Sequence, residues 1–234
     1  MRLLEVLKDF SLEDALKIEE LDKQYLYLKN LYEKIKDANI FLKISVINAL
    51  LAYQLVYKAE DFWKKFSKFF SKEKIDVCKD FEEFIEKHNF RFKENKLKRL
   101  EKICEWMSKV DLLKYKDDLK KLNIDLAKVL DQDINAKTIV FAVKIYGYCL
   151  RILGYKITFP SDIFIPIDNR ISKISKDKNF WLEISKKLKI PLLHLDSIIW
   201  VTYGMSYEEI EKIGDENLKA KMKRLKEFLN NFIV

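Results

Sequence analysis

A lysine and an aspartate, each at the expected start of a helix, are the residues whose types and spacing suggest chemistry. Lys137 opens the apolar run Thr138-Ile139-Val140-Phe141-Ala142-Val143, and Asp168 follows Pro166 by two residues. A lysine at a helix N-terminus lies at the positive end of the macrodipole, which favours the neutral amine that acts as a nucleophile. An aspartate just after a proline is typical of an N-cap. We therefore expect an amine and a carboxylate that face one cleft.

The two segments resemble the motifs of a known enzyme family. Asn135-Ala136-Lys137-Thr138 and Pro166-Ile167-Asp168-Asn169-Arg170 resemble the two active-site motifs of the helix-hairpin-helix DNA glycosylases. The run from Lys137 to Lys144, together with Ile165-Pro166-Ile167-Asp168, is similar to the archaeal 8-oxoguanine glycosylase group called AGOG. The usual Gly-x-Gly hairpin is replaced here by Asp131-Gln132-Asp133-Ile134-Asn135-Ala136. Because Asp and Asn can adopt left-handed conformations, we still expect a turn.

The resemblance implies a bifunctional DNA glycosylase and abasic-site lyase that removes 8-oxoguanine from DNA in base excision repair. Lys137 would attack the sugar carbon C1′, displace the base and form a Schiff base, and β-elimination of the 3′ phosphate would follow. Asp168 would stabilise the oxocarbenium-like sugar and relay protons. No cofactor and no metal are expected, because the attack is at carbon rather than phosphorus.

One helix face is expected to carry both the nucleophile and part of a base pocket. Phe141 and Lys144 lie four and seven residues after Lys137, so the helical repeat places all three on one face. Lys144 stands in a strongly apolar segment, where an unpaired ammonium would be costly. A second apolar segment, residues 192–200, contains Asp196 and, one turn later, Trp200.

Two interpretations of these four residues remain open. In the structural one, Lys144 and Asp196 form an internal salt bridge while Phe141 and Trp200 belong to the core. In the functional one, which the resemblance supports, Phe141 and Trp200 stack on an extruded purine. Asp196 would then accept hydrogen bonds from the guanine edge, and Lys144 would hold Asp196 or reach an oxygen of the base.

Further site residues come from the resemblance or from charge. Gln24 and Trp63 are expected in the base pocket through the resemblance alone, and a glutamine carbonyl suits the N7–H donor that distinguishes 8-oxoguanine. Their local patterns equally allow a surface Gln24 and a core Trp63. Thr138, Arg170 and Lys173 are candidates for contacts with the DNA backbone. The basic runs at 91–102 and 219–226 are interpreted mostly as solvated faces.

The composition fits an intracellular DNA-binding protein. Forty-five Lys and Arg against 37 Asp and Glu give a net charge of +8, which favours a polyanionic partner. Charged residues make up 35% of the 234-residue chain, a composition also typical of heat-loving organisms. No apolar run approaches the roughly 20 residues needed to span a bilayer, and no signal peptide is evident. We expect a cytoplasmic monomer that associates with the nucleoid during repair.

Cysteine and histidine patterns argue against a metal centre. Cys78, Cys104 and Cys149 have no Cys-x-x-Cys spacing, so neither a zinc site nor an iron–sulfur cluster is indicated. His88 and His194 are too few and too far apart, and we expect both to be structural or exposed.

Helical periodicity runs through nearly the whole chain and predicts an all-α fold. Ser11-Leu12-Glu13-Asp14 is typical of a capping box. Helices are expected at about 11–34, 38–57, 59–70, 78–89, 92–109, 111–120, 123–131, 136–153, 168–176, 179–188, 191–204, 206–213 and 215–231. Within one catalytic unit, 1–234, the resemblance implies a two-lobed helical bundle with a helix-hairpin-helix element.

The lobes are expected at about 37–153 and at 1–36 with 155–234, with a DNA-binding cleft between them. Two alternatives to the proposed activity are retained. One is a non-catalytic helical DNA-binding module, in which the Lys137 region only docks on phosphate. The other is a glycosylase of the same fold for a different lesion, such as an oxidised pyrimidine or an alkylated base.

Overall fold

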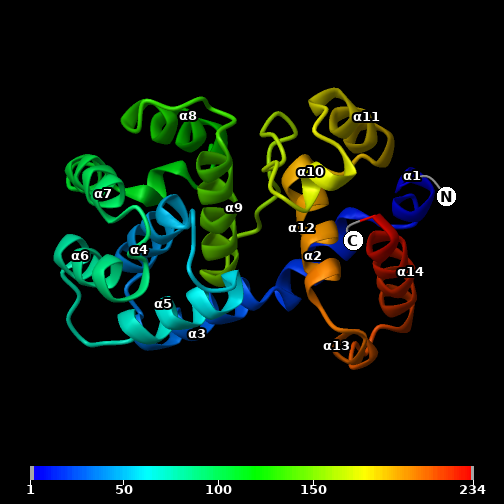
Figure 1. Cartoon of the computed structure of the whole chain (residues 1–234), viewed down its shortest axis with the longest axis horizontal. Coiled ribbons are helices and arrows are strands. Elements are labelled where there is room, and N and C mark those ends of the chain that lie inside the picture. Colours follow the sequence, from blue (N-terminus) through cyan, green and yellow to red (C-terminus); the bar gives the residue numbers. More distant parts are fainter. Residues whose placement is uncertain (1–2, 233–234) are drawn as a thin grey trace. The chain divides into compact units, whose positions relative to one another are not determined.

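A computed structural model describes residues 3–232, and within them the fold is all-α, as predicted (Figure 1). Contacts divide the chain into a terminal unit, Met1–Asp22 with Phe159–Val234, and a central unit, Lys23–Thr158. The two extreme residues at each end of the predicted single unit 1–234 lie outside the described residues. No described helix is long and apolar enough to cross a membrane.

The central unit contains seven α-helices and one 3₁₀ helix among its described residues. They are α3 (Lys23–Ile35), α4 (Ala38–Leu51), α5 (Ala59–Phe70), α6 (Val77–His88), α7 (Lys93–Met107), η1 (Leu112–Tyr115), α8 (Leu119–Val129) and α9 (Lys137–Ile152). Helix α9 packs along α4, and α3 packs against both α5 and α9. Phenylalanines spaced at helical intervals on α5 and α6 form an aromatic core, as the contact of Phe66 with Phe81 and Phe84 illustrates.

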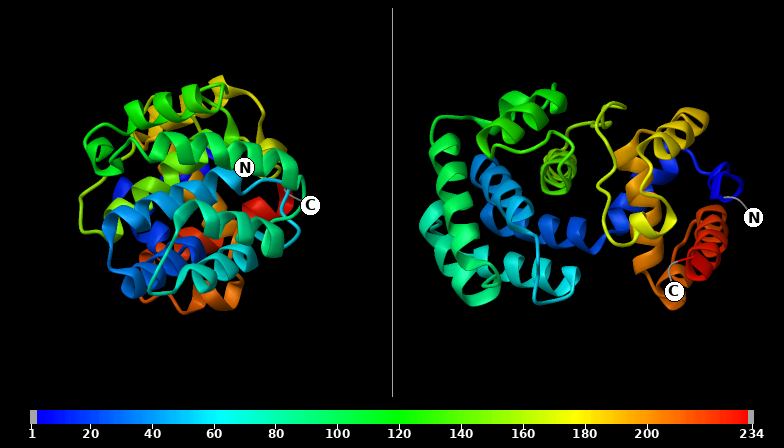
Figure 2. Two further views of the ribbon diagram at one scale, coloured as in Figure 1. Left: turned by 90° about the vertical axis from the view of Figure 1, so that its left-hand side faces the viewer. Right: turned by 45° about the horizontal axis from the view of Figure 1, so that its top comes forward.

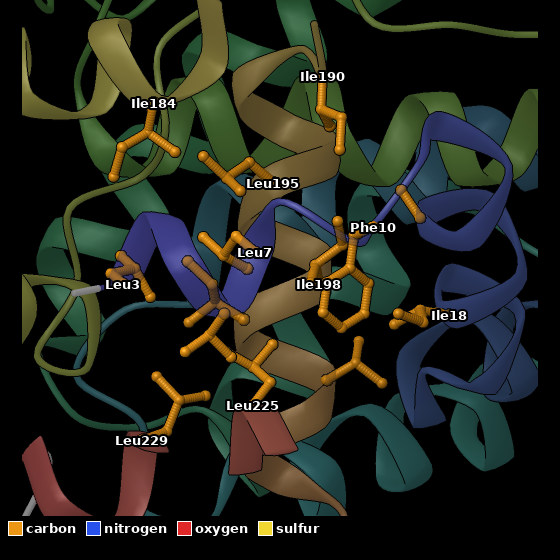
Figure 3. Packing of buried hydrophobic residues seen from close by; sticks show 14 of the residues in the cluster. Leu3, Leu7, Phe10, Ile18, Ile184, Ile190, Leu195, Ile198, Leu225 and Leu229 are labelled. Atoms are coloured by element: carbon orange, nitrogen blue, oxygen red, sulfur yellow. The ribbon is translucent and has the colours of Figure 1, made fainter. Parts of the chain in front are cut away.

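The terminal unit is built around α12. Its described helices are α1 (Leu3–Leu7), α2 (Leu12–Leu21), α10 (Ile171–Ile174), α11 (Lys178–Leu188), α12 (Leu192–Gly204), α13 (Tyr207–Glu211) and α14 (Glu216–Phe232). Helix α12 packs against α2, α14 and α11, so nearly every turn of it is buried. Figure 3 shows Leu195 and Ile198 of α12 among side chains from α1, α2, α11 and α14.

The helix predicted over 11–34 is wrong in one respect: it is broken at Asp22, whose backbone is extended (φ −61°, ψ 125°). The capping box of Ser11 with Asp14 is confirmed. The break has a physical reason, since α2 packs against α12 in the terminal unit whereas α3 packs against α5 and α9 in the central unit. The division after residue 22 therefore places residues 23–36 with the central unit, not with the predicted lobe 1–36.

Three other predicted helices are shorter in the structure. The helix predicted over 38–57 ends at Leu51, and Gln54 beyond it has a left-handed backbone (φ 48°). The helix predicted over 111–120 is the short η1, and the one over 168–176 is α10 alone. Residues 155–167 contain no helix, and this long loop leads into the segment that carries Asp168 (Figure 2).

Candidate active site

Lys137 is the first residue of α9 and is exposed. Its N-cap, Ala136, forms no side-chain hydrogen bond to the helix start. The structure confirms that Lys137, Phe141 and Lys144 lie on one face of α9, because they follow one another at one-turn intervals. Burial increases along it: Phe141 is partly buried and Lys144 is 1% exposed. The side chain of Lys137 therefore lies at the solvent-exposed end of this face.

The hairpin before α9 keeps its turn without glycine. The predicted turn is present, and within it Asp131 has a left-handed backbone (φ 50°). The N–H of Asp131 donates to the carbonyl of Lys128, and the N–H of Gln132 donates to the carbonyl of Ala127. This pair of bonds is the Schellman motif, in which the left-handed residue is most often glycine. The side chain of Asn123 on α8 also donates to the carbonyl of Ile134, which fastens the hairpin to the preceding helix.

The central unit brings together several of the predicted base-pocket residues. Trp63 is 1% exposed, and its ring lies 6.2 Å from that of Phe141 and 5.5 Å from that of Phe66. Trp63 is thus a core residue that also contacts α9. Lys144 lies over the ring of Tyr148 at 5.7 Å.

Gln24 is buried in the first turn of α3, 4% exposed, so it is not a surface residue. Its neighbour Tyr25 meets the ring of Tyr148 edge-on at 5.4 Å, which places the start of α3 against α9. The guanidinium of Arg151 lies 5.6 Å from the Tyr25 ring on the same side of the unit. Gln24, Trp63, Phe141 and Lys144 therefore belong to the three packed helices α3, α5 and α9.

Asp168, in the terminal unit, caps a helix start. Its Oδ1 accepts hydrogen bonds from the N–H groups of Arg170 and Ile171, at 2.9 and 2.8 Å. These bonds have the pattern expected of an N-cap, although the residue directly before α10 is Arg170, which forms no side-chain cap bond. Within the described residues Oδ2 forms no hydrogen bond, and the side chain is partly exposed. One carboxylate oxygen is therefore committed to structure, and the other can interact with a ligand.

A buried pair anchors the loop that leads to Asp168. The N–H of Phe159 donates to Nε2 of His194 at 3.1 Å, so the ring proton lies on Nδ1. Nδ1 is 2.8 Å from Oε1 of Glu19 and donates to it. Both side chains are fully buried. His194 is thus structural, as expected, and it ties the start of the loop to α2 and α12.

The remaining predicted residues of the terminal unit lie on α12 and around α10. Asp196 is 4% exposed on α12 and Trp200, one turn later, is partly buried. Arg170 lies over the Trp200 ring, while Lys173 is exposed. The pairing of Lys137 with Asp168, and that of Lys144 with Asp196, join residues of different units and stay predictions.

Two features escaped the sequence-based prediction. Cys78 and Cys104 form a disulfide between α6 and α7, whereas Cys149 is a free, buried thiol. The other is Arg99, a member of a basic run interpreted as a solvated face, which bonds to the hairpin and to Thr138. No group of three or more metal-ligating side chains occurs among the described residues.

Comparisons with known proteins show which family the chain resembles over nearly its whole length. Residues 4–232 match the family model AGOG, described as N-glycosylase/DNA lyase. An N-glycosylase/DNA lyase of Nanoarchaeum equitans is 39% identical over 98% of both chains. One from Methanococcus maripaludis is 37% identical over 94% of this chain and 95% of its own. The fold matches the crystal structure of Pa-AGOG, an 8-oxoguanine DNA glycosylase from Pyrobaculum aerophilum complexed with 8-oxoguanosine, with a TM-score of 0.79, 26% identity and 95% of each chain covered.

Proposed function

The chain belongs to the AGOG family of N-glycosylase/DNA lyases, and we propose that it excises 8-oxoguanine from DNA with Lys137 as the nucleophile. Family membership favours an enzyme of DNA repair over a non-catalytic DNA-binding module. The observation that carries the residue assignment is the place of Lys137, the first residue of α9 directly after the hairpin. The amine there is exposed, so it can reach a nucleotide that has been extruded from the duplex.

The reaction proceeds in two stages. The Nζ of Lys137 attacks C1′, the glycosidic bond breaks, and the base leaves with its electron pair and takes up a proton. Opening of the sugar ring gives a Schiff base between Nζ and C1′. Loss of a proton from C2′ then expels the 3′ phosphate, and hydrolysis of the Schiff base frees Lys137.

Asp168 acts beside this reaction as an electrostatic partner. Its Oδ1 is held by two backbone N–H groups, so the orientation of the carboxylate is fixed before substrate binds. Oδ2 then stabilises the positive charge that develops on the sugar and carries protons to and from it.

In the proposed substrate complex, aromatic and polar side chains bind the base. Phe141, backed by Trp63, and Trp200 stack on the two faces of the purine. Asp196 accepts from the exocyclic amine and N1–H of the guanine edge, and Lys144 holds Asp196 or reaches a base oxygen. Gln24 supplies an acceptor for N7–H, the group that guanine lacks. Thr138, Arg170 and Lys173 contact the DNA backbone, and a monomer acts on cytoplasmic, nucleoid DNA.

The test is borohydride trapping on a duplex with a single 8-oxoguanine, at elevated temperature. The native protein should give a covalent protein–DNA band, and Lys137→Gln should bind the duplex but give neither this band nor strand nicking. Lys128→Gln is the matched control, because Lys128 is an exposed lysine near the hairpin. Normal cleavage by Lys137→Gln would contradict the assignment.

A panel of lesion duplexes tests the substrate. Release of oxidised pyrimidine or alkylated base, without release of 8-oxoguanine, would show that the same fold serves another lesion. Asp196→Ala should abolish the preference for 8-oxoguanine, and unchanged activity in that variant would count against the proposed pocket.

A further inference from the structure

Arg99, on α7, joins the hairpin to the first turn of the nucleophile helix. Its Nη2 donates to Oγ1 of Thr138 at 2.8 Å and to Oε1 of Gln132 at 3.1 Å. The Thr138 hydroxyl donates to the same Gln132 oxygen at 3.3 Å, which closes a triangle. Helix α7, the hairpin and the first turn of α9 therefore meet at one guanidinium.

The two acceptors occupy informative positions. Gln132 directly follows Asp131, the left-handed residue of the hairpin turn, and Thr138 directly follows Lys137. Because Ala136 provides no side-chain cap, the first N–H groups of α9 lack the hydrogen bond that a capping side chain usually accepts. Arg99 instead holds the start of α9 from outside the helix, through its hydrogen bond to Thr138, the residue next to Lys137.

The guanidinium of Arg99 also contacts an aromatic ring. It lies over the ring of Tyr53, with Cζ 5.6 Å from the centroid, and Lys96 lies over the same ring at 5.0 Å. Burial lowers the pKa of Arg99 from its ordinary value, yet arginine stays protonated in proteins. Within the described residues no carboxylate pairs with Arg99, so its hydrogen bonds go to the neutral Gln132 and Thr138.

We propose that Arg99 is a positioning residue for Lys137. By fixing Thr138 against the hairpin, it fixes the first turn of α9 and hence the direction in which the Lys137 side chain leaves the helix. A displacement of about 1 Å at a nucleophile can lower a rate about 100-fold, so such a fastening affects catalysis without touching the substrate. This inference rests on the proposed role of Lys137.

The first measurement is the single-turnover cleavage rate of an abasic-site duplex at saturating protein, together with the Kd for that duplex at several salt concentrations. Arg99→Met, which keeps the aliphatic stem, should lower the rate about 10- to 100-fold. The Kd should change less than about threefold, with an unchanged salt dependence. Lys98→Met is the matched control, because it removes the same charge from an exposed neighbouring position and should leave the rate unchanged.

A mutant cycle tests the path of the effect. Thr138→Val removes the acceptor with little change of shape, and it should lower the rate in the same direction as Arg99→Met. The two effects should be less than additive in the double variant, because both single variants lose the Arg99–Thr138 hydrogen bond. Arg99→Lys, which keeps the charge but cannot form both bonds, should recover part of the rate.

Backbone hydrogen exchange gives a readout that does not depend on activity. Amides in the first turn of α9, residues 137–141, should exchange faster in Arg99→Met and in Thr138→Val than in Lys98→Met. If the native protein showed no Lys137-dependent cleavage, the proposed function would fail. Hydrogen exchange would still test whether Arg99 stabilises the first turn of α9. Unchanged exchange, or a loss confined to Kd with a smaller salt dependence, would overturn the proposal and indicate a phosphate contact instead.

Discussion

The guanidinium carbon of Arg170 lies 3.9 Å from the centroid of the Trp200 ring and 5.0 Å from that of Tyr203. A cation at this distance is attracted by the electron-rich face of the indole. One face of Trp200 is therefore covered by Arg170, and a base that stacks on Trp200 uses the other face. Arg170, considered from the sequence as a backbone contact, acts in the structure on a predicted pocket residue.

Replacing Arg170 should weaken recognition of the lesion in addition to removing its proposed contact with the DNA backbone. A cation–π contact contributes about 0.5–1 kcal/mol, so Arg170→Leu should lower the preference for an 8-oxoguanine duplex over an undamaged one about two- to fivefold. The measurement is the Kd for both duplexes, made with the inactive Lys137→Gln variant as background. Lys173→Leu, an exposed neighbour, should weaken binding to both duplexes alike. An equal loss of affinity for both duplexes in Arg170→Leu would show that Arg170 acts through the DNA backbone alone.

The cap formed by Asp168 allows its structural and chemical roles to be separated. Asp168→Asn keeps an acceptor for the N–H groups of Arg170 and Ile171, whereas Asp168→Ala removes it. We expect Asp168→Ala to lower the free energy of unfolding by about 1 kcal/mol and Asp168→Asn to lower it much less. Both should lower turnover about 100-fold or more, because both remove the charge.

Denaturant unfolding and single-turnover rates measure these two effects. Asp177→Ala is the matched control, because Asp177 caps α11 through the N–H of Asn179. That variant should lose similar stability with no loss of turnover. Native turnover in Asp168→Asn would show that the carboxylate serves only as a cap.

Local features of the chain were predictable because they depend on neighbouring residues. The capping box at Ser11, the left-handed turn at Asp131 and the common face of Lys137 and Phe141 follow from spacing and side-chain type. The break at Asp22 was missed because periodicity alone cannot tell that adjacent helices pack in different units.

Contacts between residues far apart in the sequence were harder to predict, although the spacing of two cysteines indicated one of them. The disulfide between Cys78 and Cys104 spans 26 residues, and its midpoint, Arg91, lies in the turn between α6 and α7. Two cysteines equally far from the turn of a helical hairpin lie at the same level along the two helices, which favours this pairing. The role of Arg99 could not have been inferred from the sequence, because it depends on where the hairpin packs against α7.

The buried Lys96 should give the stability a distinct pH dependence. Its Nζ donates to the backbone oxygen and to Oδ1 of Asn89, and burial lowers the pKa of Lys96 from 10.5 to about 8. Between these two values the unfolded chain binds more protons than the folded chain, so this group makes stability rise with pH. Below pH 8 the lysine is charged in both states, and its contribution is constant.

Comparison with Lys96→Met isolates this contribution. The native protein should gain stability relative to the variant as pH rises from about 8 to 10.5, in denaturant unfolding series at fixed salt. Lys98→Met, which removes an exposed lysine of the same helix, is the matched control for the loss of one positive charge. A difference from Lys96→Met that stayed constant over this range would contradict the lowered pKa.

The disulfide between Cys78 and Cys104 should stabilise the central unit without entering the chemistry. It closes a loop of 26 residues that contains the turn from α6 to α7, and the chain-entropy model gives about 3–4 kcal/mol for such a loop. The double variant Cys78→Ser, Cys104→Ser should lose that much stability while its single-turnover rate at moderate temperature is unchanged. Thermal unfolding with and without reductant measures the effect. Reductant should lower the Tm of the native protein to that of the double variant and leave the variant unaffected, whereas a native Tm insensitive to reductant would mean that the bond does not stabilise this unit.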